Sequence, residues 1–412
     1  MIWPRVAKIL FPNPGSRSMS KSSPSPSLPF PGRRPRIVID LEKLRHINCG
    51  LGRFSLHLGR EILALADLRF EPVFFLPRGA EAWFAKAAPP PGGRFGRLDV
   101  APWRKEAVQR FYRPLVRPVM GRPAFAAWHA TNQMSRYWPL DPRVPVILTI
   151  HDLNFLHEAP HDEQLASAGR KLADIQRKID RAAVIVTDSE FVARDVARHL
   201  ELRDKPVHVV PLGVPEPVAA STIRPGFLPA GPFLFTVGNC LAHKNFHVLL
   251  DLLEKLPGQR LVIAGKKATP YGEFLEREVA ARRLGERVVI PGEVSDADRQ
   301  WLYEHCEAFL FPSLTEGFGF PVLEAMLCGK PVFMSRRTSL PEIAGDHGYF
   351  FDAYDGDALA AAYWSGMGRY HSDPNAATRC QTHARNFSWE RMARGYAEVY
   401  ASLLPAALRR SA

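Results

Sequence analysis

Two glutamates separated by seven residues lie in the part of the chain best suited to chemistry. Glu316 is followed by the glycine-rich run 317–320, and Glu324 comes after it. An apolar run, 308–312, precedes both, which predicts the order strand, glycine loop, helix. Free N–H groups and the positive dipole end at such a helix start can bind an anion or a polar sugar, and glycines let a ligand approach closely. We expect Glu324 about two turns into the helix, so the two glutamates would reach different parts of one ligand.

A lysine and a histidine are further candidates. Lys244 follows the predicted strand 233–237, and its ammonium group can neutralise negative charge that develops on a ligand. His151 ends the predicted strand 146–150, so we expect its imidazole at the cleft edge of a domain. Both also have structural interpretations, as a surface lysine at a helix start and as a core histidine.

The motif around Glu316 and Glu324 resembles the glutamate, seven-residue spacer, glutamate motif of retaining GT-B glycosyltransferases, and is most similar to glycosyltransferase family 4. Other motifs agree with this family in order and spacing across residues 36–405. They are Gly50-Leu51-Gly52-Arg53, Thr149-Ile150-His151-Asp152, Val210-Pro211-Leu212-Gly213-Val214, and Gly238 followed by Lys244-Asn245. One glutamate pair alone would be weak evidence, but five features in family order are strong.

The resemblance implies a retaining, metal-independent hexosyltransferase. It implies that His151 and Glu316 are the catalytic residues and contact the donor sugar, Glu316 by positioning and electrostatics. Transfer in this family resembles front-face substitution, in which the departing phosphate helps to deprotonate the acceptor, so no covalent intermediate is expected. The donor would be a UDP-, GDP- or other nucleotide-diphosphate sugar, and the acceptor a glycan or a lipid-linked molecule of cell-envelope polysaccharide or lipopolysaccharide synthesis. No cofactor and no metal are expected.

The resemblance also implies a set of binding residues. Those expected to bind the donor are Gly52, Lys244, Asn245, Val294, Gly317, Phe318, Gly319, Phe320 and Glu324, and those expected to contact the acceptor or phosphate are Gly50, Arg53 and His243. Glu324 would accept from the ribose hydroxyls, and the backbone around Val294 would hold the base. His243 stands where the family usually has an arginine, and a neutral imidazole gives one hydrogen bond instead of a charged, bidentate fork.

Two alternatives remain open at the level of the sequence. A nucleotide-sugar epimerase of the same fold would need a further acid and base set, which the sequence does not display. A catalytically silent sugar-nucleotide-binding scaffold is suggested by His243, although Lys244, Glu316 and Glu324 argue against it. A dinucleotide-dependent dehydrogenase is less favoured, because no Gly-x-Gly-x-x-Gly fingerprint opens either half of the chain.

Two Asp-x-Asp patterns were weighed as metal sites. They are Asp296-Ala297-Asp298 and Asp355-Gly356-Asp357. Each opens a predicted helix, where acidic side chains cap free N–H groups and favour the dipole. We therefore interpret both as helix starts.

Short apolar runs that alternate with helical patterns predict βαβ units and an α/β fold with parallel sheets. The predicted strands are 36–40, 73–76, 146–150, 183–187, 207–210, 233–237, 260–264, 288–290, 308–311 and 331–333. With the resemblance, this gives a GT-B architecture of two Rossmann-like domains facing each other across a cleft. The predicted parts are a disordered basic Ser/Pro-rich segment (1–35), an acceptor-side domain (36–213), a linker (214–230), a donor domain (231–388) and a C-terminal helix returning to the first domain (389–412). Met19, inside the first segment, is a candidate start.

The net charge of +12 is concentrated in two regions. Residues 1–36 carry seven basic residues and no acid, and residues 94–122 carry eight basic residues against two acids. Aromatic and aliphatic residues interleave the second region, which suits an anionic membrane surface or a lipid-linked phosphate. The alternative is a solvated basic face, and Pro114 and Pro118 argue against a simple amphipathic helix. Nucleic acid is not an expected partner, since no nucleic-acid-binding module accompanies the charge.

Length and cysteine usage favour an intracellular enzyme of two domains. The chain has 412 residues, 46% of them hydrophobic, which is enough for two cores. Five cysteines are scattered without paired or metal-ligand spacing, which favours a reducing compartment. No apolar run approaches the ~18 residues that cross a bilayer. We expect a cytoplasmic protein, peripheral on the inner face of the plasma membrane.

Overall fold

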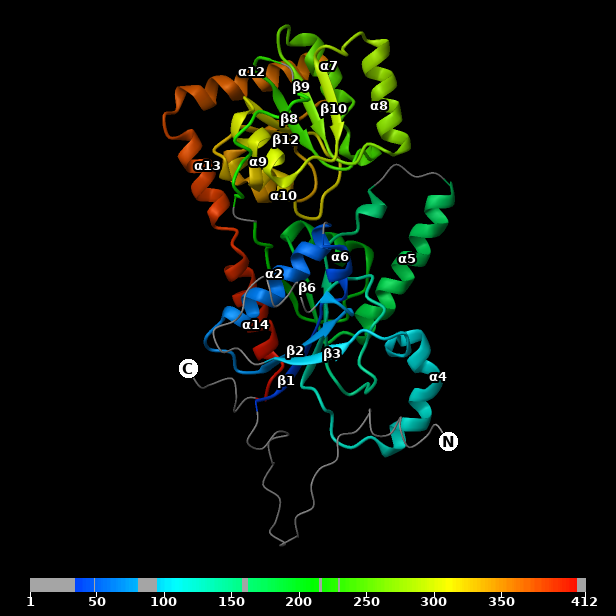
Figure 1. Cartoon of the computed structure of the whole chain (residues 1–412). Coiled ribbons are helices and arrows are strands. Elements are labelled where there is room, and N and C mark those ends of the chain that lie inside the picture. The colour runs from blue at the N-terminus through cyan, green and yellow to red at the C-terminus, as the bar shows by residue number, and fades with distance from the viewer. Residues whose placement is uncertain are drawn as a thin grey trace, which may run out of the picture. The chain divides into compact units, whose positions relative to one another are not determined.

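Two parallel β-sheets, one in each half of the chain, form the framework of the structure (Figure 1). The structure is a computed structural model and describes residues 34–47, 49–80, 95–157, 162–214, 217–228 and 230–405. The α/β prediction and the two-sheet GT-B architecture are confirmed. The segment predicted to be disordered, 1–35, lies outside the described residues except for Arg34 and Pro35.

The first sheet has seven strands in the order β3-β2-β1-β4-β5-β6-β7. Its strands are β1 (Arg36–Asp40), β2 (Glu71–Leu76), β3 (Gly96–Asp99), β4 (Ala127–Ala130), β5 (Val146–Ile150), β6 (Val184–Thr187) and β7 (Val207–Val209). The central strands are almost wholly buried, as expected for a parallel sheet covered on both faces. In the register, Val38 of β1 lies between Val73 and Trp128.

The second sheet repeats this plan with six strands in the order β10-β9-β8-β11-β12-β13. Its strands are β8 (Leu234–Val237), β9 (Leu261–Ala264), β10 (Val288–Gly292), β11 (Ala308–Phe311), β12 (Val332–Ser335) and β13 (Tyr349–Phe351). Phe309 of β11 pairs with Phe235 on one side and Val332 on the other.

Each sheet has a point where the strand order reverses. In the first sheet it lies between β1 and β4, and in the second between β8 and β11. The connections that leave these neighbouring strands run to opposite faces of the sheet and open a crevice at the carboxyl ends of the strands, where ligands bind in doubly wound folds. The loops after β1, β4, β8 and β11 are therefore placed to build a binding site.

Helices connect the strands. In the first half they are η1 (Glu42–His46), α2 (Gly50–Ala64), η2 (Pro102–Arg104), α4 (Glu106–Val116), η3 (Arg117–Val119), η4 (Asn154–Leu156), α5 (Asp162–Arg181) and α6 (Glu190–His199). In the second half they are η5 (Ala242–Lys244), α7 (Val248–Lys255), α8 (Pro270–Ala281), α9 (Asp296–His305), α10 (Phe320–Leu327), α11 (Leu340–Ala344), η6 (Gly345–His347), α12 (Gly356–Ser372), α13 (Ala376–Arg385) and α14 (Trp389–Ser402). None of the helices within the described residues combines the length and the apolar character needed to span a membrane.

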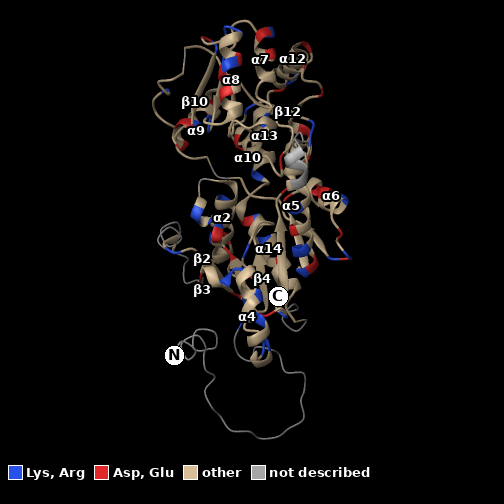
Figure 2. Cartoon of the chain, turned by 90° about the vertical axis from the view of Figure 1, so that its right-hand side faces the viewer, with Lys and Arg blue, Asp and Glu red and all other residues tan. Residues whose placement is uncertain are grey.

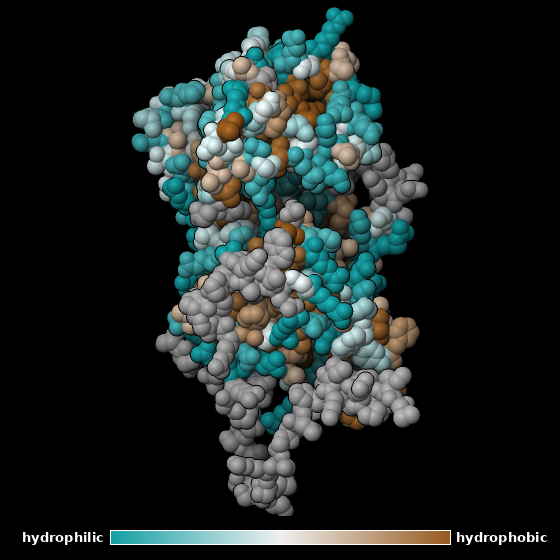
Figure 3. All heavy atoms as spheres, viewed as in Figure 1, coloured by the Kyte–Doolittle hydropathy of each residue, from teal (hydrophilic) through white to brown (hydrophobic). Residues whose placement is uncertain are grey.

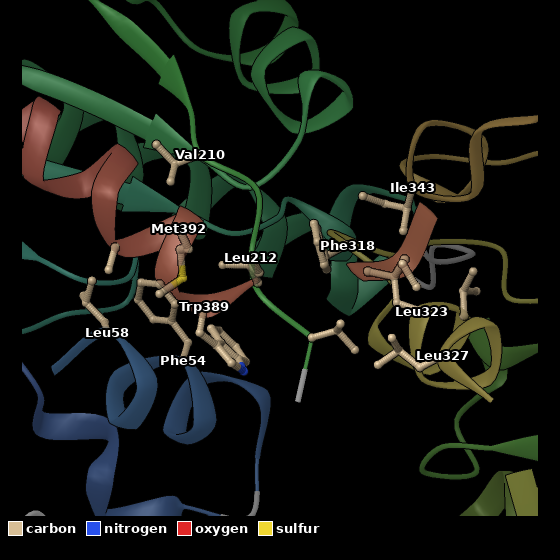
Figure 4. Close-up of a cluster of buried hydrophobic side chains, with 14 of the residues drawn as sticks. Phe54, Leu58, Val210, Leu212, Phe318, Leu323, Leu327, Ile343, Trp389 and Met392 are labelled. Atoms are coloured by element: carbon tan, nitrogen blue, oxygen red, sulfur yellow. The ribbon is translucent and has the colours of Figure 1, made fainter. Parts of the chain in front are cut away.

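The last helix, α14, packs against α2 of the first half. Trp389 stacks on His57 with ring centroids 4.3 Å apart. Gly213 is required at this contact, because a Cβ there would lie 2.3 Å from the backbone nitrogen of Trp389. Figure 4 shows Trp389 and Met392 beside side chains from α2 and from the segment after β7. This packing joins the end of the chain to the core of the first half.

Buried polar contacts also hold α14 to the first sheet. His129 Nδ1 lies 2.7 Å from the hydroxyl of Tyr400, and His129 Nε2 lies 2.8 Å from Oγ1 of Thr149. The Thr149 hydroxyl in turn lies 3.0 Å from the hydroxyl of Tyr396. Burial, with the neighbouring His151, lowers the pKa of His129 to about 3, so this histidine is neutral.

The predicted linker, 214–230, lies between β7 and β8. Its described residues form no helix or strand. The N–H of Val214 donates to the carbonyl of Phe387 (2.8 Å), and that of Ser221 to Ala297 (3.1 Å). These bonds tie the segment to the second half of the chain. The domain boundaries themselves stay a prediction.

The sequence did not predict β3, β4 or β13. All three are short, and β4 (Ala127–Ala130) holds no β-branched residue, so the pattern lacks the usual strand signal. The expectation that Pro114 and Pro118 interrupt helix formation was wrong for Pro114, because α4 continues to Val116. Pro114 lies in the last turn, where a missing N–H and a steric clash disturb little of the helix.

Candidate active site

The predicted site residues lie in loops and helix starts that follow strands at or near the two reversal points. Gly50 and Arg53 follow β1, and His151 follows β5 in the first sheet. Lys244 follows β8, and Glu316 follows β11 in the second sheet. The fold therefore brings residues from distant parts of the sequence to the carboxyl ends of the strands, where the crevice is expected.

The loop between β11 and α10 is held by two hydroxyl residues that sequence reasoning missed. The N–H of Glu316 donates to Oγ1 of Thr338 (3.0 Å). The hydroxyl of Ser339, which is fully buried, lies within hydrogen-bond distance of the carbonyls of Glu316 (3.0 Å) and Phe318 (3.1 Å). These contacts fix the backbone on either side of Gly317. A serine and a threonine in the loop after β12 carry no pattern that could have marked them.

Gly319 caps the start of α10 in the left-handed region, with φ of +108°. Most side chains would be strained in this conformation, so the position calls for glycine. Pro321 has no N–H, and the N–H of Val322 donates to the carbonyl of Gly319 (3.1 Å), so the N–H of Phe320 is the group of this first turn that can meet an anion. Glu324 is the fifth residue of this helix, so it lies just over one turn from the start and not two as expected.

Lys244 and Glu316 form an ion pair across the crevice-side loops of the second sheet. Nζ of Lys244 lies 2.5 Å from Oε1 of Glu316, and the two side chains are only 14% and 13% exposed. The turn that carries Lys244 is fixed by its N–H, which donates to Leu241 (2.9 Å), and by Asn245, whose φ of +57° ends the turn. The charges of the two groups thus compensate each other in the loop that leads into α10.

Glu324 is oriented by Tyr303, a residue that the sequence did not single out. The hydroxyl of Tyr303 donates to Oε2 of Glu324 at 2.8 Å. Burial, followed by the Glu324 charge, raises the pKa of Tyr303 well above its ordinary value, so it remains a donor. On its other side, Oε1 of Glu324 lies 3.6 Å from the guanidinium of Arg53, which also lies 3.6 Å from Asp296.

Gly50 and Gly52 belong to a helix and not to a loop. Both residues lie in the first turn of α2. A Cβ on Gly52 would lie 2.1 Å from the carbonyl oxygen of His46, so this glycine is required for packing of α2 against η1. Gly50 faces open space, with Phe320 as its nearest neighbour at 4.0 Å. A ligand contact at Gly50, Gly52 or Arg53 stays a prediction.

His151 lies at the end of β5 as predicted, but its imidazole is turned inward and is only 6% exposed. Nδ1 lies 2.6 Å from Oδ2 of Asp188, and Nε2 lies 2.8 Å from the carbonyl of Thr131. Burial lowers the pKa of His151, but Asp188 and the Thr131 carbonyl outweigh burial and raise it overall. The expectation of an imidazole at the cleft edge was therefore wrong for this arrangement, because both ring nitrogens already bind internal acceptors.

The backbone of His151 reaches the second half of the chain. A Cβ on Gly317 would lie 2.3 Å from the carbonyl oxygen of His151. The loop after β11 can approach the end of β5 only because position 317 is glycine. His151 and Gly317 are thus neighbours through their main chains. A catalytic role for the His151 side chain stays a prediction.

The remaining predicted residues support these loops. The carbonyl of His243 accepts from the N–H of Leu314 (2.7 Å) and from the hydroxyl of Ser313 (3.3 Å), which joins the loops after β8 and β11. Asn245 is buried. Val294 is half-buried between β10 and α9, where its backbone remains a predicted contact for a base.

Further contacts between the two halves were not predicted. Both carboxylate oxygens of Glu342 accept from the first N–H groups of α6, at Glu190 (2.8 Å) and Phe191 (3.0 Å). The hydroxyl of Thr315 donates to Oδ1 of Asn154 at 2.7 Å. These pairs are about 150 residues or more apart, so no local sequence pattern relates them.

Both Asp-x-Asp patterns occur at helix starts. Asp298 follows the N-cap Ser295 of α9 and donates its N–H to the serine hydroxyl (3.0 Å). Asp355 caps α12 by accepting from the N–H of Ala358 at 2.9 Å. Across the part of the chain that the structure describes, no group of three or more His, Cys, Asp or Glu residues is placed to hold a metal ion. Metal-independent chemistry stays a prediction.

Two family models match the chain. The model described as Glycosyltransferase Family 4 matches residues 50–216, and the model described as Glycosyl transferases group 1 matches residues 224–386. The O-antigen chain mannosyltransferase B of Escherichia coli is 25% identical over 391 residues, which are 86% of this chain and 96% of that protein.

Two further comparisons differ in reach. The serotype-specific mannosyltransferase WbdA of Escherichia coli is 28% identical over 192 residues, 43% of this chain, and the match spans only 24% of WbdA. The crystal structure of a glycosyltransferase from Rickettsia africae ESF-5 aligns with a TM-score of 0.64 at 16% identity and covers 90% of this chain and 99% of that one. At this identity, the structural match speaks for the fold alone.

Proposed function

The chain belongs to the group 1, family 4 glycosyltransferases of the GT-B fold and is a glycosyltransferase, and we propose that it transfers a hexose with retention from a nucleotide-diphosphate sugar. The acceptor in this proposal is a glycan or a lipid-linked molecule of cell-envelope polysaccharide or lipopolysaccharide synthesis. The relatives named as mannosyltransferases make mannose the first sugar to test.

One observation carries the proposal: the ion pair of Lys244 and Glu316 beside the start of α10. A diphosphate at this helix start would accept hydrogen bonds from the N–H of Phe320 and from the ammonium of Lys244. Glu316, released from Lys244, would face the sugar. Every ~1.4 kcal/mol by which the leaving diphosphate is stabilised more in the transition state than in the ground state raises the rate about tenfold.

Glu324 is suited to the ribose. Its carboxylate is anchored by the Tyr303 hydroxyl and retains acceptor capacity on both oxygens. It stands on the same helix whose first turn would hold the diphosphate, so nucleotide and phosphate would bind to one rigid element. No metal is needed in this mechanism, because Lys244 and the helix start supply the positive charge.

The proposed setting is the inner face of the plasma membrane. The basic region 94–122, which includes α4, would meet anionic lipid or the phosphate of a lipid-linked acceptor. Transfer would follow closure of the loops around the donor, which excludes water from the reacting centre.

Donor binding is tested first, by thermal shift of the full chain with UDP-, GDP-, ADP- and dTDP-sugars and the bare nucleotides. A ligand that binds only the folded state raises the melting temperature. The donor identified in this way is then incubated with candidate acceptors, and the anomeric configuration of the product is read by NMR. Binding without transfer to any acceptor would favour the silent scaffold, and interconversion of the donor itself would favour the epimerase.

The matched variants for this test are Lys244→Ala and Lys255→Ala. We expect Lys244→Ala to lower turnover by at least 100-fold, comparable to removal of one group that stabilises developing negative charge. Lys255 is 45% exposed in a surface ion pair with Asp357, so its variant should keep full activity. Wild-type turnover in Lys244→Ala would remove the diphosphate assignment.

A further inference from the structure

A basic cavity of about 700 Å³ lies in the first half of the chain, between α4, α5 and the segment after β4. It has no part in the site described above. Seven basic and two acidic side chains line it. They come from 105–113, 134–142 and 174–181, so the sequence region 94–122 supplies only part of the charge. Figure 2 presents the side of the molecule on which α4 and α5 lie.

The two acids of the cavity are already engaged. Glu106 binds the guanidinium of Arg113 with both oxygens, at 2.7 and 2.9 Å. Asp174 binds Lys178 at 2.7 Å and Arg177 at 2.9 Å. A bidentate Arg–carboxylate pair is a strong, directional contact. Two carboxylates cannot balance seven cations, so the cavity keeps a large excess of positive charge.

Three cations of the cavity form no salt bridge with a carboxylate among the described residues: Lys105, Arg136 and Arg181. Arg181 donates to the carbonyl of Val144 at 2.9 Å. Burial, together with the nearby charge of Arg113, lowers the pKa of Arg181. An anion in the cavity would relieve this crowding of like charges.

The walls of the cavity are fixed by hydrogen bonds. The amide of the buried Gln109 donates to the carbonyls of Arg104 (2.8 Å) and Trp138 (3.1 Å), which joins the start of α4 to the segment after β4. Arg113 Nε donates to the carbonyl of Leu140 at 2.9 Å. Lys105 also pairs with Tyr137 in an isolated antiparallel bridge. The cations thus stand on a preformed scaffold, which lowers the entropic cost of binding.

An exposed apolar stripe runs along α4 and η3, on the face of α4 opposite the cavity-lining residues Glu106, Arg110 and Arg113. It consists of Val108 (39% exposed), Phe111 (84%), Leu115 (72%) and Val119 (71%). Their spacing of three or four residues places them on one helical face. Figure 3 shows hydrophobic surface at the position of α4, at the lower right of the view. An apolar face opposite a basic face is typical of a helix that lies in a lipid interface.

We propose that the cavity binds the phosphate headgroup of an anionic lipid, while the apolar stripe contacts the acyl chains. Free phosphate would use the same cations but would leave the stripe in water, so the stripe favours the lipid-borne group. This inference deepens the membrane-facing part of the proposed function and is independent of the transfer chemistry.

The test uses the full chain and vesicles of phosphatidylcholine alone or with phosphatidylglycerol. Lys105→Gln with Arg136→Gln removes two cations that support no carboxylate in the described structure. We expect this double variant to bind anionic vesicles about 30-fold more weakly, since each basic residue near an anionic surface contributes roughly a factor of five. Phe111→Ser with Leu115→Ser should also weaken vesicle binding, and no variant should bind neutral vesicles tightly.

The matched control is Arg277→Gln with Arg394→Gln, which removes two exposed cations elsewhere. It should bind within about threefold of wild type. Equal losses in the control and the cavity variant would overturn the proposal, because they would indicate general attraction by net charge. A loss confined to the cavity variant would support it.

A third arm distinguishes the source of the phosphate. Glycerol 3-phosphate, added as a soluble probe, should compete with vesicles only at millimolar concentrations. Tight binding of this probe without vesicle binding would overturn the lipid assignment. The thermal shift of each variant with the nucleotide sugar is measured in parallel. A cavity variant that loses vesicle binding but still binds the donor would support the cavity proposal by itself. Absence of donor binding in the wild type would contradict only the proposed transferase function.

Discussion

Replacement of Glu316 by glutamine should have opposite effects on nucleotide binding and on transfer. We expect Lys244 to turn from Glu316 to a bound diphosphate, and the Glu316 carboxylate lies 2.5 Å away in a site where both side chains are about one-seventh exposed. Exposed ion pairs are worth about 0–1 kcal/mol and buried pairs cost about 3–5 kcal/mol to break, so this intermediate pair should cost about 1–2 kcal/mol. Glu316→Gln removes that cost.

The expected result is therefore a bare nucleotide diphosphate that binds about 5–30-fold more tightly to Glu316→Gln than to wild type. Transfer should fall by at least about 100-fold, because the amide lacks the negative charge that stabilises the sugar in the transition state. Isothermal titration with the bare nucleotide gives the first quantity, and single-turnover transfer gives the second.

Glu273→Gln is the control for charge. Glu273 is exposed on α8, and its loss of one negative charge should change neither quantity by more than about twofold. The reasoning fails if Glu316→Gln binds the bare nucleotide more weakly than wild type, since Lys244 would then not be released by the substitution. It also fails if transfer continues at the wild-type rate.

Three further predictions concern single groups. Glu324→Gln should weaken nucleotide binding by about 10-fold, since a neutral acceptor replaces a charged one, and a 2′,3′-dideoxy nucleotide should bind the variant and the wild type alike. Tyr400→Phe should lower the free energy of unfolding by about 1–3 kcal/mol in urea titrations, because it leaves one ring nitrogen of the buried His129 without its partner at 2.7 Å. Burial, opposed by hydrogen bonds, raises the pKa of Asp40 from 3.8 to about 7, so its contribution to stability is present below pH 3.8 and is lost as the pH rises to about 7. Wild-type stability relative to Asp40→Asn should accordingly fall by about 3 kcal/mol between pH 4 and 7, and parallel curves would contradict the raised pKa.

The sequence was sufficient to predict those features that depend on neighbouring residues. Runs such as 146–150 and 308–311 are buried, β-branched or aromatic, and they form strands at the predicted places. The spacing of the glutamates and glycines around 316–324 was enough to predict the order strand, loop, helix. Asp355 likewise caps α12 at the predicted place, whereas α9 is capped by Ser295 and not by an aspartate.

The sequence was insufficient where partners are distant. Tyr303 and Glu324 are separated by 21 residues, and His151 and Asp188 by 37. Nothing in the spacing of either pair requires contact, because the distance between them is set by how helices pack on a sheet. The basic cavity is a stronger example, since its charges come from three segments that become neighbours only in the folded chain.

The inward position of the His151 imidazole changes how the first half contributes to the site. Asp188 and Thr131 hold the ring in the core, and this fixes the main chain at the end of β5. The carbonyl of that same residue lies against Gly317, whose neighbour Glu316 carries the ion pair with Lys244. A methyl group at position 317 would collide with this carbonyl and push the loop of the second sheet away. The charged groups of the proposed chemistry therefore stand mainly on the second sheet, while the buried histidine of the first sheet determines how closely their loop can approach.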